Sequence, residues 1–256
     1  LTEELLEGID KRGRFDSQKV AVVIGPCLQR FGSEPKEGWL QNSYNYVLGR
    51  LFPDKKTETE ESPYHKGRMI LLQLLKALYR YERTSLPFDP TVDIRFLRPS
   101  EIEEGGYHKE YKKFDRLARN QYVYEFMRVG VDITPFNTLG HIAGVHYVAM
   151  HVARQLAALK VPVDLGLVSG AAAGHDIGKY GCKKSEERRI PYLHYYYTDL
   201  CFNRFHMPMI GHIAANHSTW DLELENLSVE SLILIYADFR VKSTRDKGGV
   251  EIVHFY

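Results

Sequence analysis

The strongest constraint on the fold is a succession of apolar stretches with helical spacing that begins at Thr138. Apolar residues that recur every three or four positions turn one face of a helix toward a core. Four helical stretches are predicted, over residues 139–160, 164–175, 195–217 with a break at Pro208, and 227–241. The β-branched residues here keep helical spacing, and no Asn-Gly or Asp-Gly hairpin signal occurs. The sequence therefore predicts an all-α fold whose C-terminal part is a helix bundle.

The N-terminal half is also predicted to be helical. We expect helices over residues 39–52 and about 67–83, and a charged amphipathic helix over 109–130. The apolar run at residues 17–26 fits either a short strand or a buried helix end. We therefore divide the chain into a helical N-terminal region, residues 1–130, to which no motif assigns a role, and a second domain, residues 131–256. The helix before residue 130 could equally be the first of the C-terminal bundle.

Composition excludes several classes of protein. The 256 residues carry 34 basic and 33 acidic side chains and a net charge of +1, so no broad field would attract nucleic acid. The three cysteines form no CxxC pair, which argues against a disulfide framework or a thiolate zinc cluster and favours a reducing compartment. No apolar run approaches the roughly 20 residues needed to span a bilayer, and no signal peptide is evident. We expect a cytoplasmic protein with no nucleic-acid partner.

The ends of the sequence suggest a fragment. The chain begins without Met and stops at GGVEIVHFY, which resembles a strand or helix that has been cut short. We interpret the sequence as part of a longer protein with a truncated C-terminus.

Histidine is concentrated in the C-terminal half, where eight of the eleven histidines lie between His141 and His217. Imidazole and carboxylate groups are the usual ligands of catalytic zinc, iron and manganese, and histidines on neighbouring bundle helices can converge on one ion. The most informative segment is AAAGHDIGK, residues 171–179. Its small residues allow close helix packing, its His175-Asp176 pair offers two ligands, and Gly178 is expected to let the backbone turn. These residues indicate a metal site.

Three segments in this order resemble the HD superfamily of metal-dependent phosphohydrolases. They are GHIAGVHYVAMHVARQLA, AAAGHDIGK and LILIYADFRVK, and the resemblance covers roughly residues 135–242. It implies a helical HD domain that hydrolyses a phosphate ester or anhydride with a metal-bound hydroxide. The expected substrate is a small phosphate compound, a nucleotide or dinucleotide.

The resemblance also implies the residues of the site. One divalent metal would be held by His141, His175, Asp176 and Asp238, and a second by His194 and His217 with Asp176 as the bridge. One or two ions are expected, with Fe, Mn, Zn, Mg and Ni all suitable. Asp176 and Lys179 are the expected catalytic residues, and Lys179, with Arg240 or Lys242, would hold the phosphate.

Two histidines compete for the role of first ligand. At about 100° per residue, His141 lies on the face defined by Val145, Val148, Val152, Leu156 and Leu159, whereas His146 points away from that face. Spacing favours the other residue, because His141 lies 34 residues before His175 and His146 only 29. Helical phase decides for His141. His212, close to His217, is a reserve candidate.

Other features have both a functional and an ordinary interpretation. His194 lies in the tyrosine-rich segment YLHYYY, which could be simple aromatic packing, and a ring of Tyr195–Tyr197 could stack on a base. The basic residues after the HD pair could bind nucleotide phosphates or form a solvated loop: Lys183, Lys184, Arg188 and Arg189. No phosphate-binding GxxxxGK[ST] loop, GxGxxG, HExxH or GxSxG motif is present.

Two functions compete with hydrolysis. The HD scaffold could sense a nucleotide without turning it over, or the N-terminal half could bind a partner under the control of the C-terminal half.

Overall fold

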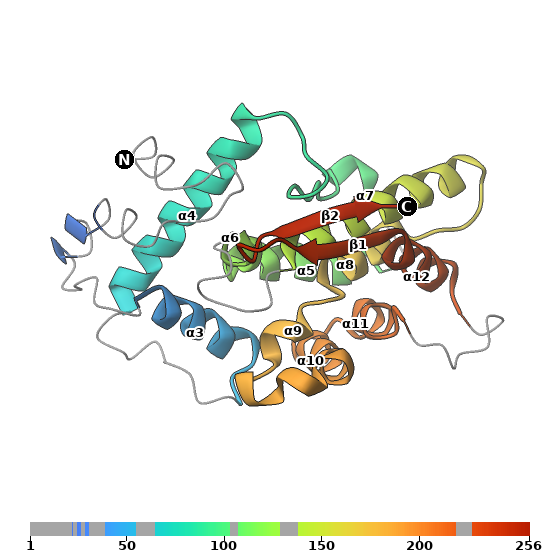
Figure 1. The fold of residues 1–256 in the computed structure, drawn as a ribbon. Helices are drawn as coiled ribbons and strands as arrows, with labels where there is room; N and C mark the ends of the chain where they lie inside the picture. Colours follow the sequence, from blue (N-terminus) through green and yellow to red (C-terminus); the bar gives the residue numbers. More distant parts are fainter. Residues whose placement is uncertain are drawn as a thin grey trace. The chain divides into compact units, whose positions relative to one another are not determined.

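The computed structural model describes residues 22, 25–26, 29–30, 39–54, 65–102, 107–128, 138–218 and 227–256. The described elements are mainly helices (Figure 1), which confirms the predicted all-α fold. The apolar run at residues 17–26 and the predicted helix end at Gly130 lie largely or wholly outside the described residues. None of the helices described here combines the length and apolarity that a bilayer crossing requires.

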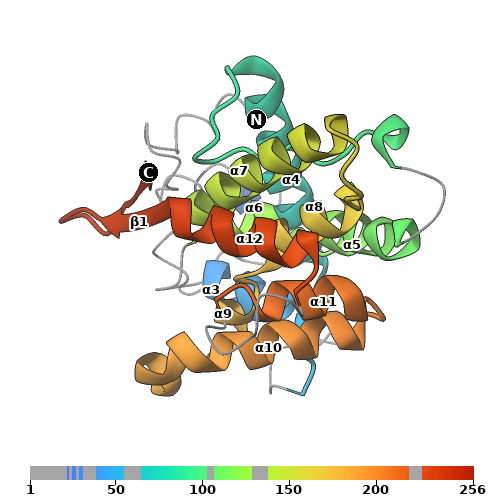
Figure 2. The same cartoon turned by 90° about the vertical axis from the view of Figure 1, so that its right-hand side faces the viewer.

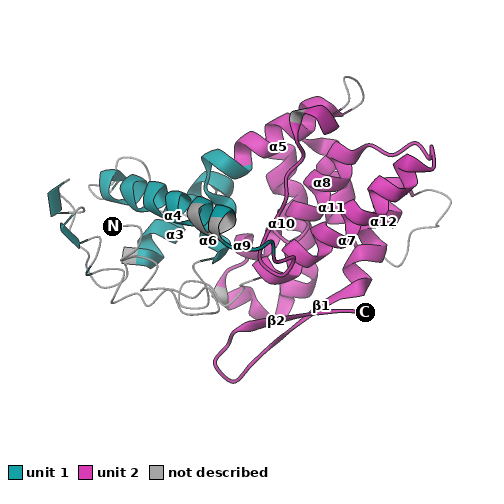
Figure 3. Ribbon diagram, turned by 90° about the horizontal axis from the view of Figure 1, so that it is seen from above, with its two compact units in different colours: residues 1–88, 118–137 teal, residues 89–117, 138–256 magenta. Residues whose placement is uncertain are grey.

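The chain forms two compact units (Figure 3). One comprises residues 1–88 and 118–137, and the other residues 89–117 and 138–256. This division differs from a boundary near residue 130, because residues 89–117 pack with the C-terminal helices. Phe114, for example, lies 6.1 Å from Phe202 between ring centroids. The alternative assignment of this segment to the C-terminal bundle therefore fits the structure better.

The first unit contains α3 (Trp39–Leu51), α4 (His65–Ser85) and α6 (Val123–Arg128). Its core includes Leu72 and Leu75 of α4, which are almost fully buried. The helix predicted over 109–130 is divided in two, because α5 (His108–Asn120) ends at a turn and α6 begins after it. At that turn Tyr122 has φ 55°, the left-handed conformation in which helices commonly stop.

The second unit is the predicted bundle (Figure 2). It contains α7 (Leu139–Ala158), α8 (Leu165–Gly174), α9 (Gly178–Gly181), α10 (Ile190–Arg204), α11 (Pro208–Ala215) and α12 (Val229–Arg240), with short 3-10 helices η1 (Pro99–Glu101) and η2 (Lys184–Arg189). Helices α7, α8 and α12 pack against one another, and α10 packs against α9 and α11. The predicted break at Pro208 is present, and α11 starts there because proline suits the first turn of a helix.

A β-hairpin follows α12, where the sequence suggested only a strand or helix cut short. Strands β1 (Val241–Arg245) and β2 (Glu251–Phe255) pair antiparallel, with Val241 opposite Phe255. Asp246 closes the turn by accepting hydrogen bonds from the backbone N–H groups of Gly248 and Val250. The hairpin packs on α7, so it stabilises the helix that carries His141.

Candidate metal centre

Helix ends from across the second unit converge on one buried cluster of histidine and aspartate side chains. His141 lies in the first turn of α7, the HD pair follows α8, His194 comes from α10 and Asp238 from the last turn of α12. The six candidate ligands are each at most 9% exposed: His141, His175, Asp176, His194, His217 and Asp238. Burial of so many ionisable groups is costly unless they are paired or bind a metal.

One group of three ligands has spacings that suit a shared ion. His141 Nε2 lies 2.9 Å from Asp238 Oδ1 and 3.2 Å from His175 Nε2. His175 Nε2 and Asp238 Oδ1 are 3.8 Å apart. Ligand atoms at about 2.1 Å from a common ion lie roughly 3.0–3.4 Å from one another, so these three fit an ion with little rearrangement.

A second group shares His175 with the first. One ligand atom each of His175, Asp176 and His217 lies within 4.8 Å of the other two. Asp176 Oδ2 lies 3.8 Å from His141 and from His175, whereas Oδ1 lies 3.7 Å from His194. The two oxygens of Asp176 are therefore directed at different histidines. His194 is not a member of the second group, but it lies next to Asp176, which is.

The backbone fixes the orientation of three of the histidines. His175 Nδ1 donates to Ala172 O at 2.8 Å, His194 Nδ1 to Ile190 O at 2.7 Å, and His217 Nδ1 to Ala214 O at 2.6 Å. A carbonyl can only accept, so each Nδ1 carries the proton and each Nε2 presents its lone pair to the cluster. Such bonds set the tautomer of metal-binding histidines.

The protonation states in the cluster also suit metal binding. Burial lowers the pKa of His175 to about 3, and it also lowers the pKa values of His194 and His217. Burial alone would raise the pKa of Asp238, but its hydrogen bond to His141 and the other histidines outweigh burial and lower that pKa to about 2. For Asp176, the opposing effect of Lys179 and the histidines likewise holds the pKa well below its ordinary value. At neutral pH the lowered pKa values keep His175, His194 and His217 neutral and both carboxylates ionised.

Two lysines border the carboxylates. Lys179 Nζ lies 2.5 Å from Asp176 Oδ2, and Lys242 Nζ lies 3.8 Å from Asp238 Oδ2 while donating to the backbone oxygen of Asp238. Arg240 instead lies over the exposed ring of Tyr236, with 5.7 Å from its guanidinium carbon to the ring centroid. Of the three cations considered for phosphate binding, the structure brings Lys179 and Lys242 to the cluster.

Gly178 allows two elements of the site to approach closely. A Cβ at this position would lie 1.9 Å from the backbone oxygen of His194 and 2.6 Å from the backbone nitrogen of Thr198. Gly178 N–H donates to Thr198 Oγ1, and the Thr198 hydroxyl donates to His175 O. The sequence predicted that Gly178 lets the backbone turn, but its φ is not positive. Glycine is needed here because α10 approaches too closely for a side chain.

His146 lies away from the cluster. Its Nε2 is 3.0 Å from Ser169 Oγ of α8, and its ring is buried near Phe96. The prediction that one face of α7, from Val145 to Leu159, is buried was only partly right, because Leu159 is 75% exposed. The most buried positions of α7 extend from Leu139 to His146 and continue at Ala149, Met150 and Ala153. His141 nevertheless joins the cluster and His146 does not.

The remaining sequence candidates take ordinary places. His212 is exposed and bonds within its own helix to Asn216, so the reserve candidate does not join the cluster. Lys183, Arg188 and Arg189 are exposed around η2. Tyr195 is closer to the site than expected, with its ring centroid 3.9 Å from that of His194 and 5.0 Å from that of His217.

Comparisons with known proteins found no match for the chain among family models, curated proteins or solved structures. The buried groups that could hold a metal ion therefore define the site through their own chemistry.

Proposed function

We propose that this chain is a metal-dependent phosphohydrolase of the HD superfamily that cleaves a phosphate ester or anhydride of a nucleotide or dinucleotide. The observation that carries the proposal is the convergence of imidazole Nε2 atoms, held by backbone carbonyls, with two ionised carboxylates. A fold needs no such cluster for stability, because buried charges are expensive. The HD order of the ligands along the sequence supports the same conclusion.

By the resemblance, His141, His175, Asp176 and Asp238 would hold one ion, and His194 and His217, with Asp176, would hold a second. In the structure His217 groups with His175 and Asp176, and His194 lies near Asp176. Divalent ions in such a site lower the pKa of bound water and neutralise charge on phosphoryl oxygens. The chain itself places the carboxylates, keeps His175, His194 and His217 neutral and buries the ligands away from bulk water.

Lys179 and Lys242 supply positive charge at the rim of the cluster. Their side chains are 24% and 48% exposed, so both can reach an incoming anion while remaining next to Asp176 and Asp238. A phosphate group bound there would exchange part of the lysine-carboxylate pairing for lysine-phosphate contacts. We assign these two lysines to substrate binding.

A nucleotide sensor without turnover is the second candidate, and one contact favours it. The Lys179 ammonium already neutralises Asp176, the carboxylate that would bridge the ions. A protein that binds a nucleotide through the same lysines but holds no stoichiometric metal would fit this pairing.

Metal content and phosphate release distinguish the two candidates. Elemental analysis of purified protein should show one or two equivalents of Mn, Fe or Zn, and a screen across nucleotides should identify a substrate. Asp176→Ala should lower turnover by orders of magnitude without unfolding the chain, whereas the exposed Asp199→Ala of α10 should not. Protein that takes up none of these metals but binds nucleotides would be a sensor. Near-normal turnover by Asp176→Ala would remove the assignment of that residue.

A further inference from the structure

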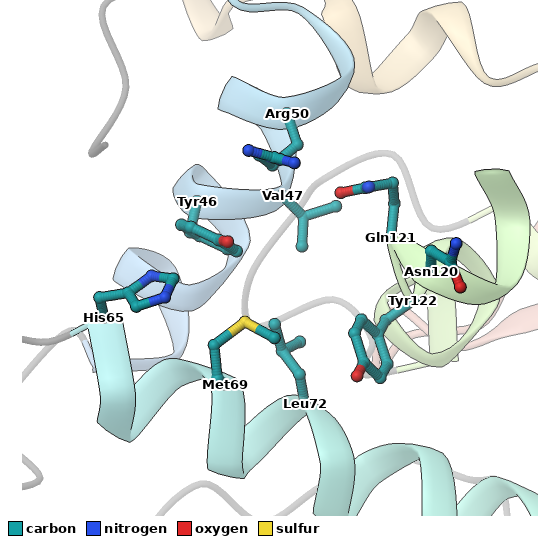
Figure 4. A pocket seen from close by; sticks show the side chains of 9 residues that line it. All are labelled: Tyr46, Val47, Arg50, His65, Met69, Leu72, Asn120, Gln121 and Tyr122. Carbon is teal, nitrogen blue, oxygen red and sulfur yellow. The ribbon is translucent and has the colours of Figure 1, made fainter. Parts of the chain in front are cut away.

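The first unit has a partly open cavity of about 240 Å³, and none of its lining residues belongs to the metal centre. It lies between α3, α4 and the turn that joins α5 to α6 (Figure 4). Val47, Met69 and Leu72 supply its apolar surface. The volume is slightly below the usual range for pockets that hold drug-sized molecules, about 300–1,000 Å³, so the cavity suits a small ligand.

Two tyrosines face this cavity from different elements. Figure 4 shows Tyr46 on the side of α3 and Tyr122 on the side of the α5–α6 turn, with Met69 and Leu72 between them. Each ring also has a cation near it, because Arg68 lies 5.5 Å from the Tyr46 centroid and Lys76 lies 4.8 Å from the Tyr122 centroid. Aromatic rings and thioether or aliphatic groups together bind planar ring systems well.

The polar side chains of the lining are two amides, the His65 imidazole, the two tyrosines and one cation, Arg50. Asn120 and Gln121 present side-chain amides that can both donate and accept hydrogen bonds, as the edge of a heterocyclic base requires. The guanidinium of Arg50 lies at one end of the cavity (Figure 4). Among the described residues that line the cavity, none is Asp or Glu. The cavity therefore favours a ligand that is neutral at its ring and anionic at one end.

The backbone conformation at Tyr122 shapes the wall of the cavity. Its φ of 55° is the left-handed conformation that follows the end of α5. The conformation places Tyr122 in the wall of the cavity directly after the two amide residues. The last residue of α5 and the two turn residues after it thus contribute two amides and an aromatic ring.

We propose that this cavity binds a nucleoside monophosphate as a second site, separate from the metal centre. The base packs against Tyr46, Tyr122 and the apolar surface, and its edge bonds to Asn120 or Gln121. The phosphate pairs with Arg50, whose planar guanidinium suits phosphate oxygens. Because all lining residues belong to the first unit, this proposal does not depend on the reaction proposed for the second unit.

Calorimetric titration with AMP, GMP, CMP and UMP tests the proposal. EDTA in the buffer prevents binding through added metals, and adenosine and inorganic phosphate serve as the partial ligands. We expect saturable 1:1 binding of at least one monophosphate, weaker binding of the nucleoside and no detectable binding of phosphate alone. No saturation by any of the four monophosphates up to about 10 mM, an affinity near 3 kcal/mol, would overturn the proposal.

Three variants locate the binding. Arg50→Gln should weaken monophosphate binding about tenfold and leave nucleoside binding unchanged, because only the phosphate contact is lost. Gln121→Ala should weaken the binding of both the monophosphate and the nucleoside. If circular dichroism shows that Arg50→Gln does not fold, Gln121→Ala alone tests whether the ligand lies in this cavity. Arg116→Gln, an exposed arginine of α5, is the matched control and should bind normally.

The metal centre needs its own control. His217→Ala should retain monophosphate binding, because it lies outside the cavity. Loss of binding in this variant, or equal binding by Gln121→Ala and Arg116→Gln, would place the ligand elsewhere and contradict the proposal.

Discussion

The carboxylate of Glu251 accepts a hydrogen bond of 3.1 Å from the backbone N–H of His141. Its other oxygen accepts from Gly140 N–H at 2.9 Å. A strand of the hairpin thus supplies the acceptor that the first turn of α7 lacks, since the hydroxyl of Thr138 at the N-cap makes no capping bond. A negative charge at a helix N-terminus is also favourable. The hairpin therefore helps to position a candidate metal ligand.

We expect Glu251→Ala to lower the unfolding free energy by about 1 kcal/mol, and by no more than about 2 kcal/mol, as the loss of a helix cap does. Metal affinity should fall as well, because the first turn of α7 loses the contact that holds His141. Urea unfolding and metal titration measure the two effects. Glu187→Ala, an exposed glutamate of η2, provides the comparison. Equal unfolding midpoints for both variants would show that Glu251 does not stabilise the helix.

The contact at Gly178 leads to a second prediction. Because a Cβ there would lie 1.9 Å from His194 O, Gly178→Ala must move α10 away from the HD segment. We expect a loss of roughly 1–3 kcal/mol in unfolding free energy, as in other overpacked sites, together with weaker metal binding. Gly248→Ala in the exposed hairpin turn is the control, because its φ is not positive. A normal unfolding curve and metal content for Gly178→Ala would show that the two segments can separate at no cost.

The sequence predicted the features that depend on local pattern. Apolar periodicity and Pro208 located the helices of the bundle, and the order of the HD residues indicated which side chains would meet. Features formed by distant segments were not predictable. Glu251 caps a helix that begins more than a hundred residues earlier, and Thr198 binds the HD segment from another helix. Neither residue belongs to a local motif.

The face of α7 shows that the phase argument for His141 was incomplete, although His141 does lie in the cluster of candidate ligands. The phase argument weighted large apolar residues such as Leu156 and Leu159, but these lie near the end of the helix, where Leu159 is 75% exposed. Small residues instead let α7 pack closely, and Ala143, Ala149 and Ala153 are fully buried. A stripe of large side chains does not reveal a face of that kind.

His146 makes the stability of the protein depend on pH. Burial lowers the pKa of His146 to about 3 in the folded state, against 6.5 for an unburied histidine. Between these values the unfolded state takes up a proton that the folded state does not, so stability falls as pH falls from about 6.5 toward 3. We expect His146→Gln to reduce the slope of unfolding free energy against pH by up to about 1.4 kcal/mol per unit between pH 6 and 4. His212→Gln, at an exposed position, should leave the slope unchanged, and equal slopes for both variants would contradict a buried neutral His146.

The two histidines of α7 should also separate metal binding from stability. His141 Nε2 lies 2.9 Å from Asp238 Oδ1 and 3.2 Å from His175 Nε2, so His141→Ala removes a ligand from the most compact group. Metal occupancy and any phosphate release should fall together, while the fold is retained. His146→Ala should instead lower the stability of the fold and leave metal binding unchanged. It removes a ring that is 3% exposed and bonded to Ser169, so the unfolding free energy should fall by roughly 1–3 kcal/mol while metal binding at 20 °C is kept. Metal titrations and urea unfolding of both variants measure all four effects. If His146→Ala alone loses metal, the shorter spacing to His175 identifies the true ligand, and the cluster around His141 is only a hydrogen-bonded core.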